Sequence, residues 1–284
     1  MLVRFSGKFP RMPRNLFEIS QNTRIKVLEV SKKANKGHIG SGLSICEIVV
    51  AILDSADGVG SDDDDRTRIV LSKGHAALAL YSALSEFGII SDDELYSYCV
   101  NGSKFGTHPD PIQTGTDFMT GSLGQGIGFG VGAAMAAKIK NRQSQTFVVL
   151  SDSELNEGST WESLFVAGHN NLKSLVVVLD LNGQQAMGKT RDVMQLDGMP
   201  NQLAMVGWNC LALDGHDSEN LALAFSRKLD DGSKPLLVFA KTIAGKGISF
   251  MEGKIEWHYL PQSDEQHRLA IEEVNKFRQR NREN

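Results

Sequence analysis

The chain has 284 residues, of which 41% are hydrophobic and 23% are charged, a composition typical of soluble globular proteins. A formal net charge of −4 argues against nucleic-acid binding, and no apolar run is long enough to cross a membrane. The three cysteines, Cys46, Cys99 and Cys210, are widely spaced, which argues against a disulfide framework or a zinc site and predicts a cytoplasmic location. The basic N-terminus lacks the continuous apolar core of a signal peptide.

The first part of the chain predicts mostly helices. Apolar residues from Leu16 to Val30 recur at helical spacing, and Ser91 with Glu94 forms the capping box of a later helix. An aspartate-rich stretch at 61–66 is interpreted as a solvated loop. The elements expected before Ser91 are helices over 15–34, 44–53 and 74–87 and a short strand over 68–71.

The second part alternates strands with helices. A glycine-rich start introduces a predicted helix over 121–140 whose small residues suit close packing, and strands are expected near Val148, Val177, Cys210 and Val238. This alternation predicts an α/β fold with a doubly wound, mostly parallel sheet flanked by helices. Because no repeat or linker is evident, residues 1–284 are predicted to form a single domain. An N-terminal arm precedes this domain's first helix, and a charged helical tail, 264–284, ends it.

Two polar residues follow neighbouring strands of this predicted sheet. The strand 146–150 ends just before Asp152, and the strand 175–181 ends just before Asn182. Because the carboxyl ends of parallel strands share one edge, we expect both residues there, with Asp152 at the surface and not in the core. Either residue alone would be an ordinary turn residue. Together their oxygens suit Mg²⁺, which takes its other ligands from water and phosphate, so the pair predicts a magnesium-held phosphate or diphosphate.

The segment around this pair resembles the thiamine diphosphate motif, which is Gly-Asp-Gly followed after a similar spacer by Asn-Asn or Asn-Gly. Its flanking residues, Glu154 to Gly158 and Leu179 to Gly183, are similar to the transketolase family. More segments match that family in the same order, so the resemblance covers nearly the whole chain. These segments are 37–40, 70–76, 106–109, 120–126, 167–169, 214–217, 241–247 and 256–258.

The resemblance implies roles for individual residues. Histidines that line the channel over the thiazolium ring would bind sugar hydroxyls and relay protons; these are His38, His75, His108 and His258, with His75 also touching the cofactor. His169 and His216 are interpreted as structural. Glu157 would face its counterpart in a second copy, where two close carboxylates share a proton.

The cofactor contacts implied by the resemblance come from three parts of the chain. The backbone of Gly121 would contact the aminopyrimidine, and Leu123 would pack near the thiazolium ring. Mg²⁺ would be bound by the side chains of Asp152 and Asn182 and the backbone carbonyl of Gln184.

Three residues depart from the family pattern. Ser151 and Ser153 replace the usual glycines, and Ile39 replaces a proline. The Cβ of Ser153 would be costly if its backbone needed a positive φ, although its amide can still face the diphosphate and its hydroxyl could bond a phosphate oxygen. Since Asp152 and Asn182 are retained, we expect cofactor binding to be retained.

The resemblance implies the N-terminal subunit of a split transketolase, which uses thiamine diphosphate and Mg²⁺ to transfer a two-carbon ketol unit from a ketose or its phosphate to an aldose. A C-terminal transketolase subunit would supply the pyrimidine-binding domain and its glutamate, so activity would need an α2β2 assembly. A truncated chain would look the same. Two alternatives stay open: a subunit of another thiamine diphosphate enzyme that acts on an unusual sugar or a 2-oxoacid, and a degenerate, non-catalytic scaffold subunit.

Overall fold

The computed structural model describes residues 14–195, 198–226 and 232–283; the predicted N-terminal arm, 1–13, lies outside them. A five-stranded sheet in the order β1-β2-β3-β7-β6 forms the centre, and all its neighbouring strands are parallel. The prediction of an α/β fold with a parallel sheet is therefore confirmed. The strands are β1 (Arg68–Leu71), β2 (Thr146–Ser151), β3 (Leu175–Leu181), β6 (Asn209–Asp214) and β7 (Leu236–Lys241), and a separate ribbon pairs β4 (Gln184–Gln185) with β5 (Gly188–Lys189).

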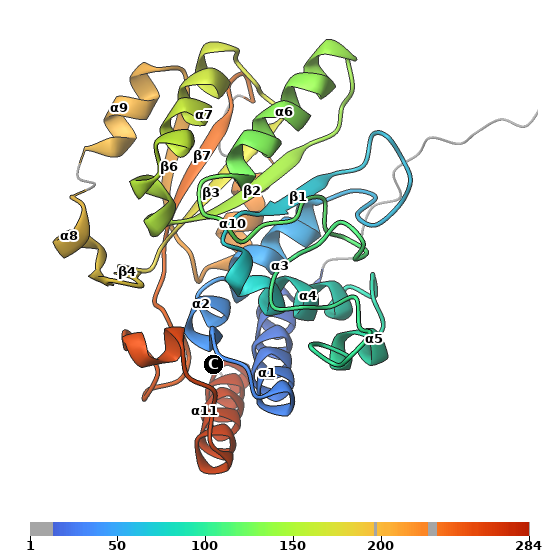
Figure 1. Cartoon of the computed structure of the whole chain (residues 1–284), viewed down its shortest axis with the longest axis vertical. Helices are drawn as coiled ribbons and strands as arrows, with labels where there is room; N and C mark the ends of the chain where they lie inside the picture. The colour runs from blue at the N-terminus through green and yellow to red at the C-terminus, as the bar shows by residue number, and fades with distance from the viewer. Residues whose placement is uncertain (1–13, 196–197, 227–231, 284) are drawn as a thin grey trace, which may run out of the picture.

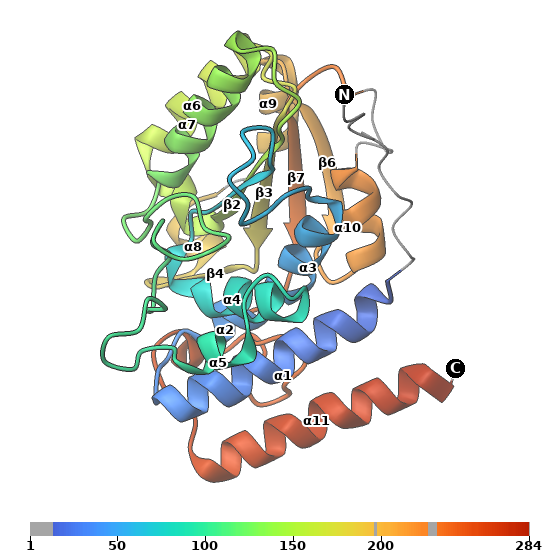
Figure 2. The ribbon, with the colours of Figure 1, turned by 90° about the vertical axis from the view of Figure 1, so that its right-hand side faces the viewer.

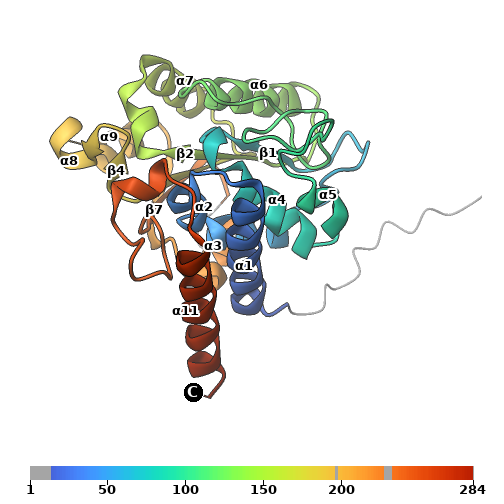
Figure 3. The ribbon, with the colours of Figure 1, turned by 60° about the horizontal axis from the view of Figure 1, so that its bottom comes forward.

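Helices cover both faces of the sheet (Figure 1). One face carries α6 (Gly126–Ile139) and α7 (Gly158–His169), and the other carries α3 (Cys46–Ser55) and α10 (Ser218–Phe225), as Figure 2 shows. Figure 3 shows the same layers from another side, with α6 and α7 above the strands and α3 below them. The helix α1 (Leu16–Ala34) lies outside α3, and Figure 2 shows α11 (Asp264–Glu283) running alongside α1. The shorter helices are α2 (Ile39–Leu43), α4 (Ala77–Glu86), α5 (Asp92–Tyr96), α8 (Thr190–Val193), α9 (Met199–Met205) and the 3-10 turns η1 (Gly74–Ala76), η2 (Asp152–Asn156) and η3 (Ile255–His258).

The strands β2, β3 and β7 are mostly apolar because their side chains alternate between two buried cores. Phe147 and Val149 of β2 join the core shared with α1, α3 and α4, whereas Val148 and Leu150 join the core beneath α6 and α7. The glycine-rich sequence of α6 lets it approach the sheet closely, because a Cβ at Gly130 would collide with the side chain of Val148. The expectation of close packing by this helix is confirmed.

Most predicted boundaries agree with the structure, including the capping box of Ser91 and Glu94 at α5. The helix predicted from 121 is wrong at its start, since α6 begins only at Gly126. Gly124 has φ +77° and packs where a Cβ would lie 2.6 Å from the Cβ of Glu157, so residues 121–125 form a loop pressed against α7. In the described residues, no helix combines the length and the apolar character that crossing a membrane needs.

Candidate active site

The carboxyl ends of the central strands bring the polar motifs to one edge of the sheet. Ser151 at the end of β2 pairs with Asp180 near the end of β3, so Asp152 and Asn182 follow adjacent strands at this edge. The prediction that they share an edge is confirmed.

Asp152 is buried, with only 1% of its surface exposed, which corrects the expectation of a surface carboxylate. It begins η2, and the hydroxyl of Thr190 donates to its Oδ2. Its Oδ1 is buried without a hydrogen-bond partner, and burial raises the pKa of this carboxyl to about 6. A buried carboxylate with an unpaired oxygen is costly, which makes Asp152 a strong candidate for holding a cation.

More buried polar atoms without partners lie beside Asp152. They are Asn156 Oδ1 and Gln185 Nε2, although Asn156 Nδ2 does donate to Gln185 Oε1 at 2.7 Å. Buried polar groups in proteins are normally satisfied, so this group fits a polar ligand that supplies the missing partners.

The amide of Asn182 is held in one orientation. Its Nδ2 donates to Asp180 Oδ2 at 3.0 Å, and its Oδ1 accepts the backbone N–H of Gln184 at 2.9 Å. A carbonyl oxygen has two lone pairs, so Oδ1 keeps acceptor capacity for a metal. The side chain of Gln184 is engaged elsewhere, because it donates to the carbonyl of Gly253.

Asp180 anchors this edge through several donors. Its buried carboxylate pairs with the buried ammonium of Lys73 and accepts hydrogen bonds from Ser44 at 2.8 Å and from Thr242. Burial alone would raise the pKa of Asp180, but the charge of Lys73 and these hydrogen bonds outweigh it and lower the pKa. Sequence reasoning missed this pair, although an aspartate inside the apolar strand β3 was an available signal.

Three predicted histidines come together at this edge from separate elements. His38 precedes α2, His75 lies in η1 and His258 ends η3. Their ring centroids are 5.4 Å apart for His38 and His75, 5.3 Å for His38 and His258, and 5.2 Å for His75 and His258. His108 lies near Gly121, where a Cβ would be 3.4 Å from its Cδ2. We call His38, His75 and His258 the histidine cluster.

Burial lowers the pKa of every histidine in the cluster. The pKa of His258 falls to about 4, and the charges of His38 and Lys73 add to the lowering by burial. The pKa of His75 falls well below its usual range, and the charge of Lys73 again adds to the lowering. Burial lowers the pKa of His38 and of His108 as well. Neutral imidazoles each present one donor and one acceptor, so the cluster suits hydroxyl recognition near neutral pH.

The departure at Ser153 carries no backbone strain. Ser151 has φ −94°, and Ser153 lies in η2 and is absent from the non-glycine residues with positive φ in the described ranges. Those residues are Asn35, His38, Cys99, Asn141 and Asn171. Serine therefore fits this backbone.

Glu154 ties the loop 121–125 to the strand ends. Its buried carboxylate accepts the backbone N–H of Gly124 at 3.0 Å, the backbone N–H of Ser151 at 2.9 Å and the hydroxyl of Ser72. Burial raises its pKa. The loop that holds Gly121 and Leu123 is thus fixed beside η2, whereas Glu157 is exposed at the start of α7.

A cavity of about 420 Å³ opens beside Asp152. Lys189 and Arg191 line it together with Thr190, and both cationic residues are exposed. Their positive charge complements a phosphate or diphosphate. Sequence reasoning missed these residues because they lie in the β5–α8 region, outside every matching motif.

No group of three or more histidine, cysteine, aspartate or glutamate side chains converges on a metal position in the part of the chain that the structure describes. A cation at this edge would therefore take few charged protein ligands. This donor set fits Mg²⁺, which keeps waters and phosphate oxygens in its coordination sphere.

Comparison with known proteins places the chain among transketolases. Residues 17–279 match the family described as "Transketolase, thiamine diphosphate binding domain". The chain is 36% identical to one subunit of the apulose-4-phosphate transketolase of Phocaeicola vulgatus, over 90% of this chain and 92% of that protein. It is 34% identical to 6-deoxy-6-sulfo-D-fructose transketolase subunit SqwG of a Clostridium species, over 88% of this chain and 92% of that protein.

Full-length transketolases match over less than half of their length. The solved transketolase of Campylobacter jejuni superposes with a TM-score of 0.84 at 28% identity, covering 93% of this chain and 43% of that one. Human transketolase is 33% identical over 91% of this chain and 42% of its own length.

Proposed function

This chain belongs to the transketolase family, whose thiamine diphosphate-binding domain it contains, and we propose that it is the diphosphate-binding subunit of a two-subunit transketolase. The enzyme transfers a two-carbon ketol unit from a ketose or ketose phosphate to an aldose acceptor. Residues 1–284 form a single diphosphate-binding domain in this proposal. The observation that carries it is the buried carboxylate of Asp152, which has an unpaired oxygen and lines a cavity of about 420 Å³ that Lys189 and Arg191 also line.

In this proposal Asp152, Asn182 and the backbone carbonyl of Gln184 bind Mg²⁺, which in turn holds the diphosphate. The backbone N–H of Ser153 would face the diphosphate when the cofactor is bound, and the unpaired oxygen of Asp152 supports the assignment of the metal. When bound, the cofactor supplies the chemistry that breaks and forms the carbon–carbon bond. The loop held by Glu154 positions Gly121 and Leu123 against the cofactor's rings.

The histidines act on the substrate. Neutral rings of His38, His75 and His258 donate to and accept from sugar hydroxyls, and each ring can move a proton between its nitrogens and a bound hydroxyl. Their lowered pKa values support this role because the rings stay neutral at physiological pH. His108, which lies near Gly121, also binds a sugar hydroxyl in this proposal.

A partner subunit completes the enzyme in this proposal. The two relatives matched over 92% of their length are both named as transketolase subunits. The outer face of α6 and α7 exposes Phe129, Ile139, Phe165 and Val166, of which Ile139 is 73% and Phe165 50% exposed. Large apolar side chains exposed on two neighbouring helices are a feature of interaction sites. We assign it to subunit contacts of an α2β2 assembly, in which Glu157 faces its counterpart across the two-fold axis.

The substrate of this enzyme is proposed to be a specialised sugar. The names of the two subunit relatives specify apulose 4-phosphate and 6-deoxy-6-sulfo-D-fructose, neither of which is a common ketose.

A cytoplasmic location is also part of the proposal. The cysteines Cys46, Cys99 and Cys210 are free, which supports this location.

The test is a coupled ketol-transfer assay on the purified chain with and without its C-terminal partner subunit. We expect no turnover by the chain alone and turnover by the complex, because a cofactor whose diphosphate is anchored without orientation of its ring loses the benefit of positioning. Light scattering on the same samples should give the mass of an α2β2 complex. Robust turnover by the isolated chain would refute the two-subunit proposal, and a complex that binds no cofactor would favour the scaffold alternative.

A further inference from the structure

The segment that ends at His258 of the histidine cluster contains little regular structure. We call residues 242–258 the β7–η3 segment, because it runs from the end of β7 to η3. A segment of this kind needs contacts from the surrounding elements to hold its end residue in place. The contacts that fix it therefore bear on how precisely His258 is positioned.

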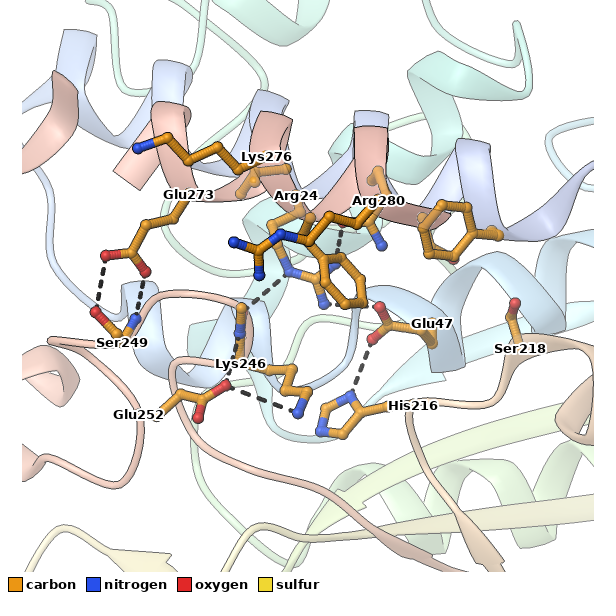
Figure 4. A pocket seen from close by; sticks show the side chains of 16 residues that line it. Arg24, Glu47, His216, Ser218, Lys246, Ser249, Glu252, Glu273, Lys276 and Arg280 are labelled. Carbon is orange, nitrogen blue, oxygen red and sulfur yellow. Dashed lines mark hydrogen bonds and ion pairs between the residues drawn. The ribbon is translucent and has the colours of Figure 1, made fainter. Parts of the chain in front are cut away.

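His216, in the turn between β6 and α10, contacts the start of this segment. The backbone N–H of Ile243 donates to His216 Nε2 at 2.9 Å, and His216 Nδ1 lies 3.1 Å from Glu47 Oε2 (Figure 4). A backbone N–H can only donate, so Nε2 carries no proton and Nδ1–H donates to the carboxylate. The two contacts together require a neutral ring in a single tautomer.

Glu47 extends this connection to α1. Its carboxylate is buried on α3, and its Oε1 accepts from Arg24 NH2 at 2.7 Å. Arg24 Nε then donates to the backbone carbonyl of Lys246 at 3.0 Å. Burial would raise the pKa of Glu47, but Arg24 and His216 outweigh it and lower the pKa. We call Arg24, Glu47 and His216 the relay. It forms hydrogen bonds to the backbone of the segment at Ile243 and at Lys246.

Gly245, which lies between Ile243 and Lys246, connects the segment to α2, the helix that follows His38. The backbone N–H of Gly245 donates to the carbonyl of Gly40 in α2, at 3.0 Å. Gly40 also packs against η3, because a Cβ there would lie 3.3 Å from the carbonyl oxygen of Trp257. The relay thus supports the backbone on both sides of the cluster, next to His38 and next to His258.

We propose that His216 is a positioning residue, which acts through the relay and the β7–η3 segment to hold His38 and His258 in their reactive arrangement. The proposal rests on the proposed function of the histidine cluster. His216 itself contacts Glu47 and Ile243 and not the cluster. Its role is to supply a donor on one side of the ring and an acceptor on the other.

A cavity of about 400 Å³ gives direct access to the relay. It lies between α1, α11 and the β7–η3 segment, and His216, Glu47 and Arg24 form part of its wall (Figure 4). A small molecule can therefore reach the space left by a truncated His216. Imidazole has the donor and the acceptor that the relay needs, whereas 1-methylimidazole keeps the acceptor and lacks the donor.

The test uses His216→Ala in the complex with the partner subunit. We expect kcat to fall about 10- to 100-fold through mispositioning of the cluster, with little change in the affinity for thiamine diphosphate and Mg²⁺. Imidazole should restore much of the lost kcat, and 1-methylimidazole should restore much less. His267→Ala, in α11 and outside the residues that line this cavity, is the matched control and should keep wild-type activity.

Hydrogen exchange supplies a readout that does not depend on turnover. Peptides covering residues 242–253 of the complex should exchange faster in His216→Ala than in wild type, and imidazole should slow them again. If wild-type complex shows no ketol transfer, the proposed function fails while this measurement still tests the relay. Wild-type kcat and exchange in His216→Ala, or equal rescue by imidazole and 1-methylimidazole, would overturn the proposal.

Discussion

Asp152 and Asp180 are both buried at the ends of adjacent strands, yet their surroundings are opposite. Asp180 accepts from Lys73, Ser44, Thr242 and Asn182, and its pKa is lowered. Asp152 has Thr190 as its side-chain donor and an oxygen without a partner, and burial raises its pKa to about 6.

This difference separates a structural carboxylate from one suited to a ligand. The charge of Asp180 is already balanced inside the protein by Lys73. That of Asp152 is not, so a bound cation would stabilise its ionised form. Burial of a carboxylate therefore says little about its role until its donors and countercharges are known.

Removing the countercharge of Asp180 should have the largest effect on stability. Lys73→Met leaves a buried carboxylate unpaired, for which we expect a loss of about 3–5 kcal/mol in the free energy of unfolding. Urea denaturation measures it. The control is the double variant Lys73→Met with Asp180→Leu, which should regain much of the loss because no buried charge remains. A single variant as stable as wild type would mean that Asp180 does not depend on Lys73.

Removing the donor to Asp152 should cost less. Thr190→Val takes away the hydroxyl that bonds Oδ2, and we expect a loss of about 1–3 kcal/mol in the free energy of unfolding for the unsatisfied acceptor. The pKa of Asp152 should rise further, since this hydrogen bond lowers it. Denaturation and carboxyl titration by NMR check the two effects. A pKa that falls in Thr190→Val would contradict the description of this site.

His258 extends the comparison to a group that burial keeps neutral. Its pKa is about 4 in the folded protein and about 6.5 when unfolded. Between these values the unfolded state binds more protons, so this group makes stability rise with pH from about 4 to 6.5, and the contribution is lost as pH falls. Denaturation at pH 5 and pH 7 should show a smaller difference for His258→Gln than for wild type. An equal difference would show that His258 titrates normally.

Restoring the usual glycine next to Asp152 should have the smallest effect. Because Ser153 is outside the set of residues with positive φ, Ser153→Gly in the complex should bind thiamine diphosphate as well as wild type or slightly better, by calorimetry. A tenfold weaker affinity, about 1.4 kcal/mol, would mean that the hydroxyl of Ser153 contacts the diphosphate.

The sequence was sufficient to predict the parallel sheet and the shared edge of Asp152 and Asn182. Both follow from the alternation of apolar strand segments with helices, which can be read directly along the chain. It could not pair Lys73 with Asp180, which lie 107 positions apart, nor Glu47 with His216, which lie 169 apart. The burial of Asp152 also depends on distant packing, including Thr190. The late start of α6 follows from the contact of Gly124 with α7, which spacing alone does not reveal.

The most direct measurement is calorimetry of thiamine diphosphate with Mg²⁺ on the complex, comparing wild type with Asp152→Asn. Asparagine keeps the size of the side chain but removes the charge that is unbalanced inside the protein, so the variant should fold with at least wild-type stability. We expect it to lose at least about 100-fold in cofactor affinity, equivalent to about 2.7 kcal/mol. A stable variant that binds the cofactor with wild-type affinity would contradict the assignment of Asp152 as a metal ligand.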